Sequence, residues 1–121
     1  MCVVRRPMQI EDLTHAIRQF RDERDWKKFH RPKDLSAAIA IEAAELQEIF
    51  LWKTSDEIDQ LLASKPIAVA DEVADLAIYL LAFADTVGVD LPQAVVSKLE
   101  KNAAKYPVDK ARSSAKKYTE L

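Results

Sequence analysis

Glycine and cysteine each occur once in this 121-residue chain, and proline occurs five times. A sheet-rich fold needs many tight turns, which depend largely on glycine and proline. The apolar residues recur instead at helical spacing, so the sequence predicts an all-α fold. The single cysteine, Cys2, excludes both a disulfide within the chain and a cysteine-based metal cluster.

The chain also lacks an excess of positive charge and a long apolar run. Its formal net charge is −2 at pH 7, which gives no basic footprint for duplex nucleic acid. Residues 1–7 contain no apolar region of the kind found in signal peptides. The best candidate for a membrane span is interrupted by Asp71, Glu72 and Asp75. We therefore expect a cytoplasmic protein that binds neither nucleic acid nor a membrane.

The length predicts one domain, residues 1–121, built as a four-helix bundle. The four long helices are expected over about residues 9–29, 34–52, 66–87 and 91–106, with a short helix near 55–62. Residues 109–121 are rich in Lys, Arg and Ser and poor in apolar residues. We expect this tail to be irregular or mobile.

Proline, glycine and capping residues predict where these helices begin and end. Pro32 is expected to break the chain after the first helix, and Asp34 or Ser36 is expected to cap the second. Pro66 suits the first turn of the third helix. Gly88 is placed to cap its C-terminal end.

Two of these helices each carry a pair of acids three positions apart, Glu42 with Glu45 and Glu72 with Asp75. Side chains at this spacing share one face of a helix. Glu42 falls within an apolar stripe, and the other three acids lie at the borders of such stripes. Carboxylates are rarely buried unless they are paired or bind a metal. Facing helices would gather four acids around one space, which a cation such as Mg²⁺ would stabilise.

The same spacing leaves other interpretations open. Acid pairs of this kind are common on solvated helix faces, so spacing alone favours neither a metal site nor surface charge. A second alternative is a non-catalytic helical interaction module whose acids pair with arginines or lysines across a subunit interface. A di-iron carboxylate site is disfavoured because such sites use Glu-x-x-His pairs. Neither His15 nor His30 has that spacing from an acid pair.

Further motifs lie along the chain from residue 11 onward. They are Glu23-Arg24-Asp25-Trp26, Phe29-His30, Trp52-Lys53-Thr54, Val89-Asp90-Leu91-Pro92, Tyr106-Pro107, Ala111-Arg112-Ser113-Ser114 and Lys117-Tyr118-Thr119-Glu120-Leu121. With the acid pairs, they resemble the all-α NTP pyrophosphatases (MazG-like), and most closely the dCTP pyrophosphatase branch. Ile41 stands where the general motif has its first glutamate, although this branch also lacks an acid there. Ile17 stands where the branch carries a histidine.

The resemblance implies an enzyme that hydrolyses a nucleoside triphosphate to the monophosphate and pyrophosphate. Its implied substrate is dCTP or a modified dCTP, which it would remove from the nucleotide pool. The implied cofactor is Mg²⁺, for which Mn²⁺ can substitute. The resemblance implies four metal ligands, Glu42, Glu45, Glu72 and Asp75. We take Glu45 as the combined ligand and general base.

The substrate itself is expected to contact aromatic and polar side chains. By resemblance, the base lies in an apolar slot formed by Trp26, Trp52 and Tyr79. Cationic side chains near the last helix are the candidates for holding the outer phosphates, and an amide there could bond to a phosphate or sugar oxygen. These polar candidates are Lys98, Asn102, Lys105 and Arg112.

A four-helix core this short, with an ionic centre, buries little apolar surface as a monomer. Phe50, Leu51 and Trp52 add apolar bulk beyond one face of the second helix. We therefore expect a homo-oligomer, a dimer or a tetramer, with the site near a subunit interface.

Overall fold

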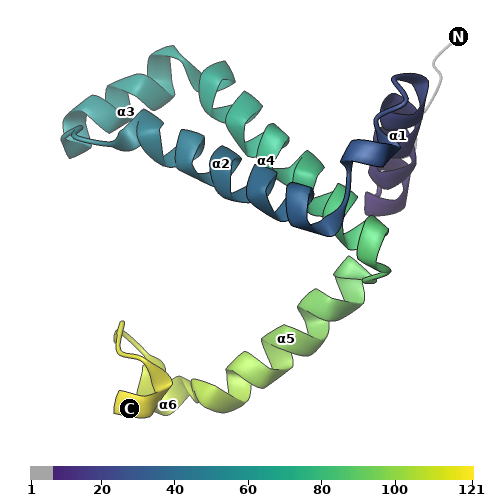
Figure 1. Ribbon diagram of the computed structural model, residues 1–121. Coiled ribbons are helices and arrows are strands. Elements are labelled where there is room, and N and C mark those ends of the chain that lie inside the picture. The colour runs from purple at the N-terminus through teal and green to yellow at the C-terminus, as the bar shows by residue number, and fades with distance from the viewer. Residues whose placement is uncertain (1–6) are drawn as a thin grey trace, which may run out of the picture. The chain divides into compact units, whose positions relative to one another are not determined.

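The computed structural model describes residues 7–121, and all regular secondary structure in this part of the chain is helical (Figure 1). The α-helices are α1 (Ile10–Glu23), α2 (Pro32–Phe50), α3 (Ser55–Ser64), α4 (Pro66–Val87), α5 (Leu91–Lys105) and α6 (Val108–Ala111). Two short 3₁₀ segments are η1 (Lys27–Phe29) and η2 (Tyr118–Glu120). The predicted all-α class is confirmed. No helix within residues 7–121 has the length and apolar character needed to cross a bilayer.

The chain divides into two compact units, the first ending at Gly88 and the second covering Val89–Leu121. Helices α1 to α4 belong to the first unit, and α5 and α6 to the second. The single domain over residues 1–121 and the packing of four long helices into one bundle therefore stay predictions.

The first unit is built around α2 and α4, which run side by side and are joined through α3 (Figure 1). Helix α1 also packs against α4. Leu35, near the start of α2, is only 1% exposed, and the other buried apolar residues within 7–121 are Leu81, Ala82 and Ala84 near the end of α4. Burial of one such leucine contributes ~1.5–3 kcal/mol. The core thus lies at the end of the helix pair away from α3.

Several predicted helix ends are confirmed. Pro66 occupies the first turn of α4, and Gly88 caps that helix with a left-handed φ of 75°. Such a φ is accessible to glycine without the steric cost that a Cβ atom brings. Asp90 caps α5 by accepting a hydrogen bond from the backbone N–H of Gln93 at 3.2 Å.

The predicted break before the second helix is confirmed, because Arg31 has an extended backbone, but the predicted cap of that helix is wrong. Helix α2 begins at Pro32 itself, and Arg31 occupies the N-cap position with an extended backbone. Proline has its φ already set for a helix and lacks only an N–H that would be unpaired at this position. It therefore initiates the helix, and neither Asp34 nor Ser36 is its cap.

The predicted first helix over residues 9–29 is too long. Helix α1 ends at Glu23, and Asp25 has a φ of 53°, outside the helical region. Aspartate tolerates this left-handed conformation better than most residues. The chain then continues as η1, so the aromatic and charged residues after Glu23 leave the line of α1.

The second unit places part of the tail against the end of α5. The ring of Tyr118 meets Tyr106 edge-on, with ring centres 6.0 Å apart. The Lys105 ammonium lies 4.8 Å from the centre of the Tyr118 ring, within the range of a cation–π contact. The tail predicted to be irregular contains η2 and the end of α6, with irregular backbone between them. Its mobility stays a prediction.

Candidate metal centre

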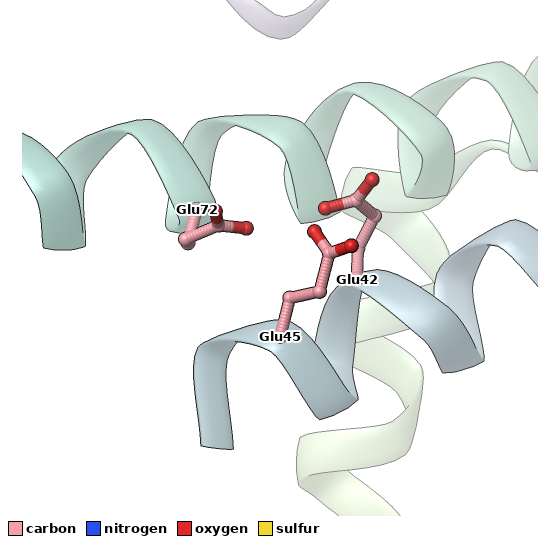
Figure 2. A group of neighbouring side chains, drawn as sticks. All are labelled: Glu42, Glu45 and Glu72. Carbon is pink, nitrogen blue, oxygen red and sulfur yellow. The ribbon is translucent and has the colours of Figure 1, made fainter. Parts of the chain in front are cut away.

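Three glutamate side chains from two helices converge on the facing sides of α2 and α4 (Figure 2). Glu42 and Glu45 come from successive turns of α2, and Glu72 comes from α4. One carboxylate oxygen of each lies within 4.8 Å of the others. The i, i+3 spacing places the first two on one face of α2, and the packing of the helix pair brings the third to them. A hollow of about 410 Å³ lined by Glu45, Glu48, Ile49 and Glu72 adjoins the group.

Asp75, the fourth predicted ligand, lies one turn after Glu72 on α4 and is exposed. It is not part of the group whose oxygens lie within 4.8 Å of one another. Its negative charge nevertheless adds to the burial that raises the pKa of Glu42 and of Glu72. The structure thus brings three of the four acids together and places the fourth beside them.

Without a cation, burial and the neighbouring carboxylates disfavour the ionised forms of Glu42 and Glu72. Burial raises the pKa of Glu42 to about 7, and the neighbouring carboxylate of Glu45 adds to this increase. Burial is also the main cause that raises the pKa of Glu72, followed by the charge of Glu45. The Oε2 atoms of Glu42 and Glu72 are buried and have no hydrogen-bond partner within residues 7–121. No lysine or arginine in this part of the chain forms an ion pair with the three glutamates.

This donor set suits a hard divalent cation. The group offers carboxylate oxygens alone, which are the ligands that Mg²⁺ and Mn²⁺ prefer. A cation among them would replace the missing partners of the buried oxygens and favour the ionised form of each acid. The residues present therefore fit a divalent metal.

The three aromatic candidates for base binding occupy different places. Tyr79 follows Asp75 by about one turn on α4 and is half-buried. Trp26, just before η1, meets Phe20 edge-on with ring centres 5.8 Å apart. Trp52 follows the end of α2 with a left-handed φ of 64° and is 92% exposed. The Trp52 ring therefore has almost no contact with its own chain and is available to a ligand or to another chain.

Comparison with known proteins identifies the family of this chain. The model of the MazG-like family matches residues 37–121. The chain belongs to the MazG-like family. The dCTP pyrophosphatase 1 of Homo sapiens is 44% identical over 114 residues, which cover 93% of this chain and 67% of that protein. The Mus musculus protein of the same name is 42% identical over 114 residues, with the same coverage.

A solved structure agrees with this assignment. The crystal structure of a pyrophosphatase from Archaeoglobus fulgidus has a TM-score of 0.78 and 42% sequence identity to this chain. The match covers 88% of this chain and 99% of the archaeal chain. The resemblance to the dCTP pyrophosphatase branch is thus confirmed. The family match begins within α2, so it includes all four predicted acids and leaves out α1 and η1.

In this MazG-like chain, the polar candidates for phosphate binding all lie in the second unit. Lys98, Asn102 and Lys105 follow one another at four and three positions along α5, so they share a face of that helix. Arg112 follows α6 directly. Their role towards a substrate stays a prediction.

A polar hollow outside the carboxylate group was not predicted from the sequence. Its lining comes from α1, η1, the start of α2 and the end of α4. Arg18 of α1 and Asp85 of α4, which form an ion pair there, are 67 positions apart in the chain. No local spacing connects such residues, so only the fold reveals that they meet.

Proposed function

We propose that this chain is a divalent-metal-dependent nucleoside triphosphate pyrophosphohydrolase of the cytoplasmic nucleotide pool. It prefers dCTP or a modified dCTP, and nucleic acid and membranes are not its partners. The observation that carries the proposal is the convergence of Glu42, Glu45 and Glu72, two of which have a buried oxygen with no hydrogen-bond partner among the described residues 7–121. The relatives named dCTP pyrophosphatase 1 support the choice of substrate.

Glu42, Glu45, Glu72 and Asp75 would hold Mg²⁺, and Mn²⁺ would substitute for it. When bound, the cation offsets the charges of the carboxylates and the triphosphate and lowers the pKa of a coordinated water. Glu45 is exposed, whereas Glu42 and Glu72 are half-buried. The carboxylate of Glu45 also lines the adjoining hollow, where a water molecule can reach it. Glu45 is therefore our candidate to accept the proton of the attacking water.

Side chains outside the acid group would hold the nucleotide. The exposed ring of Trp52 suits stacking on a base, which contributes ~1–3 kcal/mol and tolerates different bases. Tyr79 would form a wall of this slot. Trp26 precedes α2 and Trp52 follows it, ~28 Å apart along that helix at 1.5 Å per residue, so Trp26 would complete the slot from another copy of the chain. Discrimination between bases must then come from polar contacts to their edges. The candidates for contacts to phosphate and sugar oxygens are Lys98, Asn102, Lys105 and Arg112.

A substrate screen tests this proposal. The protein is incubated with Mg²⁺ and each canonical or cytosine-modified (d)NTP, and pyrophosphate and nucleotide products are quantified. We expect dCTP or a modified dCTP to have the highest kcat/KM, at least about tenfold above dATP and dGTP, because the polar edges of the bases differ. Nucleoside monophosphate and pyrophosphate should appear in equal amounts. Release of inorganic phosphate with a nucleoside diphosphate, or no turnover of any nucleotide, would contradict the proposal.

We also propose that the chain works as a homo-oligomer, a dimer or a tetramer. Large apolar side chains are exposed in both compact units, among them Ile41, Ile67 and Leu99. Each unit leaves much of its apolar surface in water, which favours association. Further copies of the chain are the natural cover for these surfaces.

Sedimentation equilibrium tests the oligomeric state. At micromolar protein concentration we expect two or four times the mass of one chain, because apolar surface of this extent drives association. The measurement is repeated with and without Mg²⁺ to separate metal binding from assembly. A single-chain mass up to about 100 μM under both conditions would refute the oligomer.

A further inference from the structure

A second hollow lies where α1, η1, the start of α2 and the end of α4 meet, all within the first unit. Its volume is about 510 Å³, within the ~300–1,000 Å³ common for small-molecule sites. Half of its eight lining residues are cationic, whereas the hollow beside the carboxylate group is lined by acids and one isoleucine. The titratable residues of this basic hollow are Arg18, Arg21, Lys27, His30, Arg31 and Asp85.

Two of the four cations already have acidic partners. Arg18 donates two hydrogen bonds to the carboxylate of Asp85, one of them from Nε at 2.8 Å. Arg21 donates from Nε to Asp22 at 2.8 Å, and the Arg21 side chain is only 12% exposed. Within each pair the positive and negative charges offset each other. Both arginines line the hollow.

The other two cations have no such partner. Within residues 7–121, no acidic side chain forms an ion pair with Lys27 or Arg31. The hydrogen bond from Arg18 is the main cause that lowers the pKa of Asp85. The positive charge of Lys27 lowers it further, which indicates that Lys27 lies near Asp85. Four cations against Asp22 and Asp85 leave two positive charges at the hollow.

The wall of the hollow also contains His30 and the N-terminal end of α2. The Nδ1 atom of His30 is buried and has no hydrogen-bond partner within residues 7–121. Burial lowers the pKa of His30, with a smaller contribution from Arg21, so the ring is neutral near pH 7. Helix α2 begins at this wall, and its N-cap residue Arg31 makes no side-chain capping bond. The N-terminal end of a 19-residue helix carries a partial positive charge, although Pro32 at this wall has no N–H to donate.

We propose that the basic hollow binds a small phosphate-type oxyanion, such as inorganic phosphate or pyrophosphate, independently of the carboxylate group and of divalent metal. Arginine and lysine are the side chains that recognise phosphate oxygens. Lys27 and Arg31, which have no ion-pair partner within residues 7–121, supply the charge, and the paired Arg18 and Arg21 complete the wall.

Isothermal titration calorimetry of the full chain tests the site. The titrants are inorganic phosphate and pyrophosphate in EDTA, with sodium chloride at matched ionic strength as the reference. Without metal, the carboxylate group repels these anions, and the variants of the basic hollow separate its binding from any binding to the cations of the second unit. We expect saturable binding of one anion per chain. Arg31→Ala and Lys27→Ala should each raise Kd by about tenfold or more, because each removes a charge-assisted hydrogen bond.

Lys65→Ala is the matched control variant. Lys65 is an exposed cation of the first unit directly before α4, and no ion pair involves it within residues 7–121. It lies ~30 Å along that helix from Asp85, at 1.5 Å per residue. Its removal should change Kd by less than about twofold. Arg31→Lys, which keeps the charge, should recover part of the affinity lost in Arg31→Ala, and circular dichroism verifies that each variant is folded.

A third titrant, dCMP, distinguishes the source of the phosphate group. If Arg31→Ala weakens dCMP and phosphate alike, the hollow accepts the phosphate of a nucleotide. If dCMP does not bind while phosphate does, the hollow accepts only the free anion. Either result supports the site. Absence of saturable anion binding, or equal loss of affinity in Lys65→Ala and Arg31→Ala, would overturn it. Glu45→Gln should leave this binding unchanged, which separates it from the proposed hydrolysis.

Discussion

Glu45→Gln is expected to lower kcat/KM for Mg²⁺-dependent hydrolysis of dCTP by about 1,000-fold. The substitution keeps the size of the side chain and removes its negative charge. It thereby takes away one proposed metal ligand and the group proposed to accept the proton of water, and a general base alone contributes ~100- to 10,000-fold. Steady-state assays of pyrophosphate release measure the loss. The far-UV circular dichroism spectrum should stay that of a helical protein.

The stability of the same variant distinguishes a functional acid from a structural one. In the metal-free protein, the carboxylate of Glu45 adds to the burial that raises the pKa of both Glu42 and Glu72, so it repels them. Removing that charge should leave the metal-free Tm unchanged or raise it. An acid that merely stabilised the fold would lower Tm on replacement.

Asp71→Asn is the matched control for Glu45→Gln. Asp71 is an exposed acid on α4, next to Glu72 in the sequence but outside the carboxylate group. Its replacement removes one negative charge close to the site and should change kcat/KM by less than about threefold. Full activity of Glu45→Gln, or an equal loss in both variants, would refute the assignment of Glu45.

The sequence predicted α4 most accurately because both of its ends depend on local chemistry. Pro66 sets the backbone of the first turn, and Gly88 adopts the left-handed φ that ends the helix. The end of α1 was missed because Asp25, not a glycine, takes the left-handed φ there. The charged residues around Asp25 have good helix propensity, so no local signal indicated the turn.

The carboxylate group was largely predictable, because Glu42 and Glu45 have helical spacing at an apolar stripe that must face another helix. The position of Asp75 was not. Three residues along a helix turn the side chain by about 300°, so Asp75 lies some 60° away from Glu72 around the axis of α4. Which of the two acids points at α2 depends on the rotation of α4, and only packing fixes that rotation. The basic hollow was unpredictable for the same reason, since tertiary contacts alone assemble it.

Mg²⁺ added to the metal-stripped protein is expected to raise its Tm by about 10 °C when Mg²⁺ exceeds its Kd by about 100-fold. Binding to the native state alone contributes ~2.7 kcal/mol at that ratio, and 1 kcal/mol shifts Tm by several degrees in a chain of this size. Differential scanning fluorimetry or calorimetry across a Mg²⁺ series measures the shift. Mn²⁺ should produce a similar one, and sodium chloride at equal ionic strength should not.

This titration also decides between the enzyme and a helical interaction module. Acids that pair with lysine or arginine across a subunit interface are already neutralised, so added Mg²⁺ would leave their Tm unchanged. The buried Oε2 atoms of Glu42 and Glu72 have no hydrogen-bond partner in the part of the chain that the structure describes, and they gain one when the metal binds. Glu72→Gln should therefore abolish most of the Mg²⁺-dependent shift, whereas Asp71→Asn should keep it. A wild-type protein that showed no shift at saturating Mg²⁺ and Mn²⁺ would refute the metal centre and favour the interaction module.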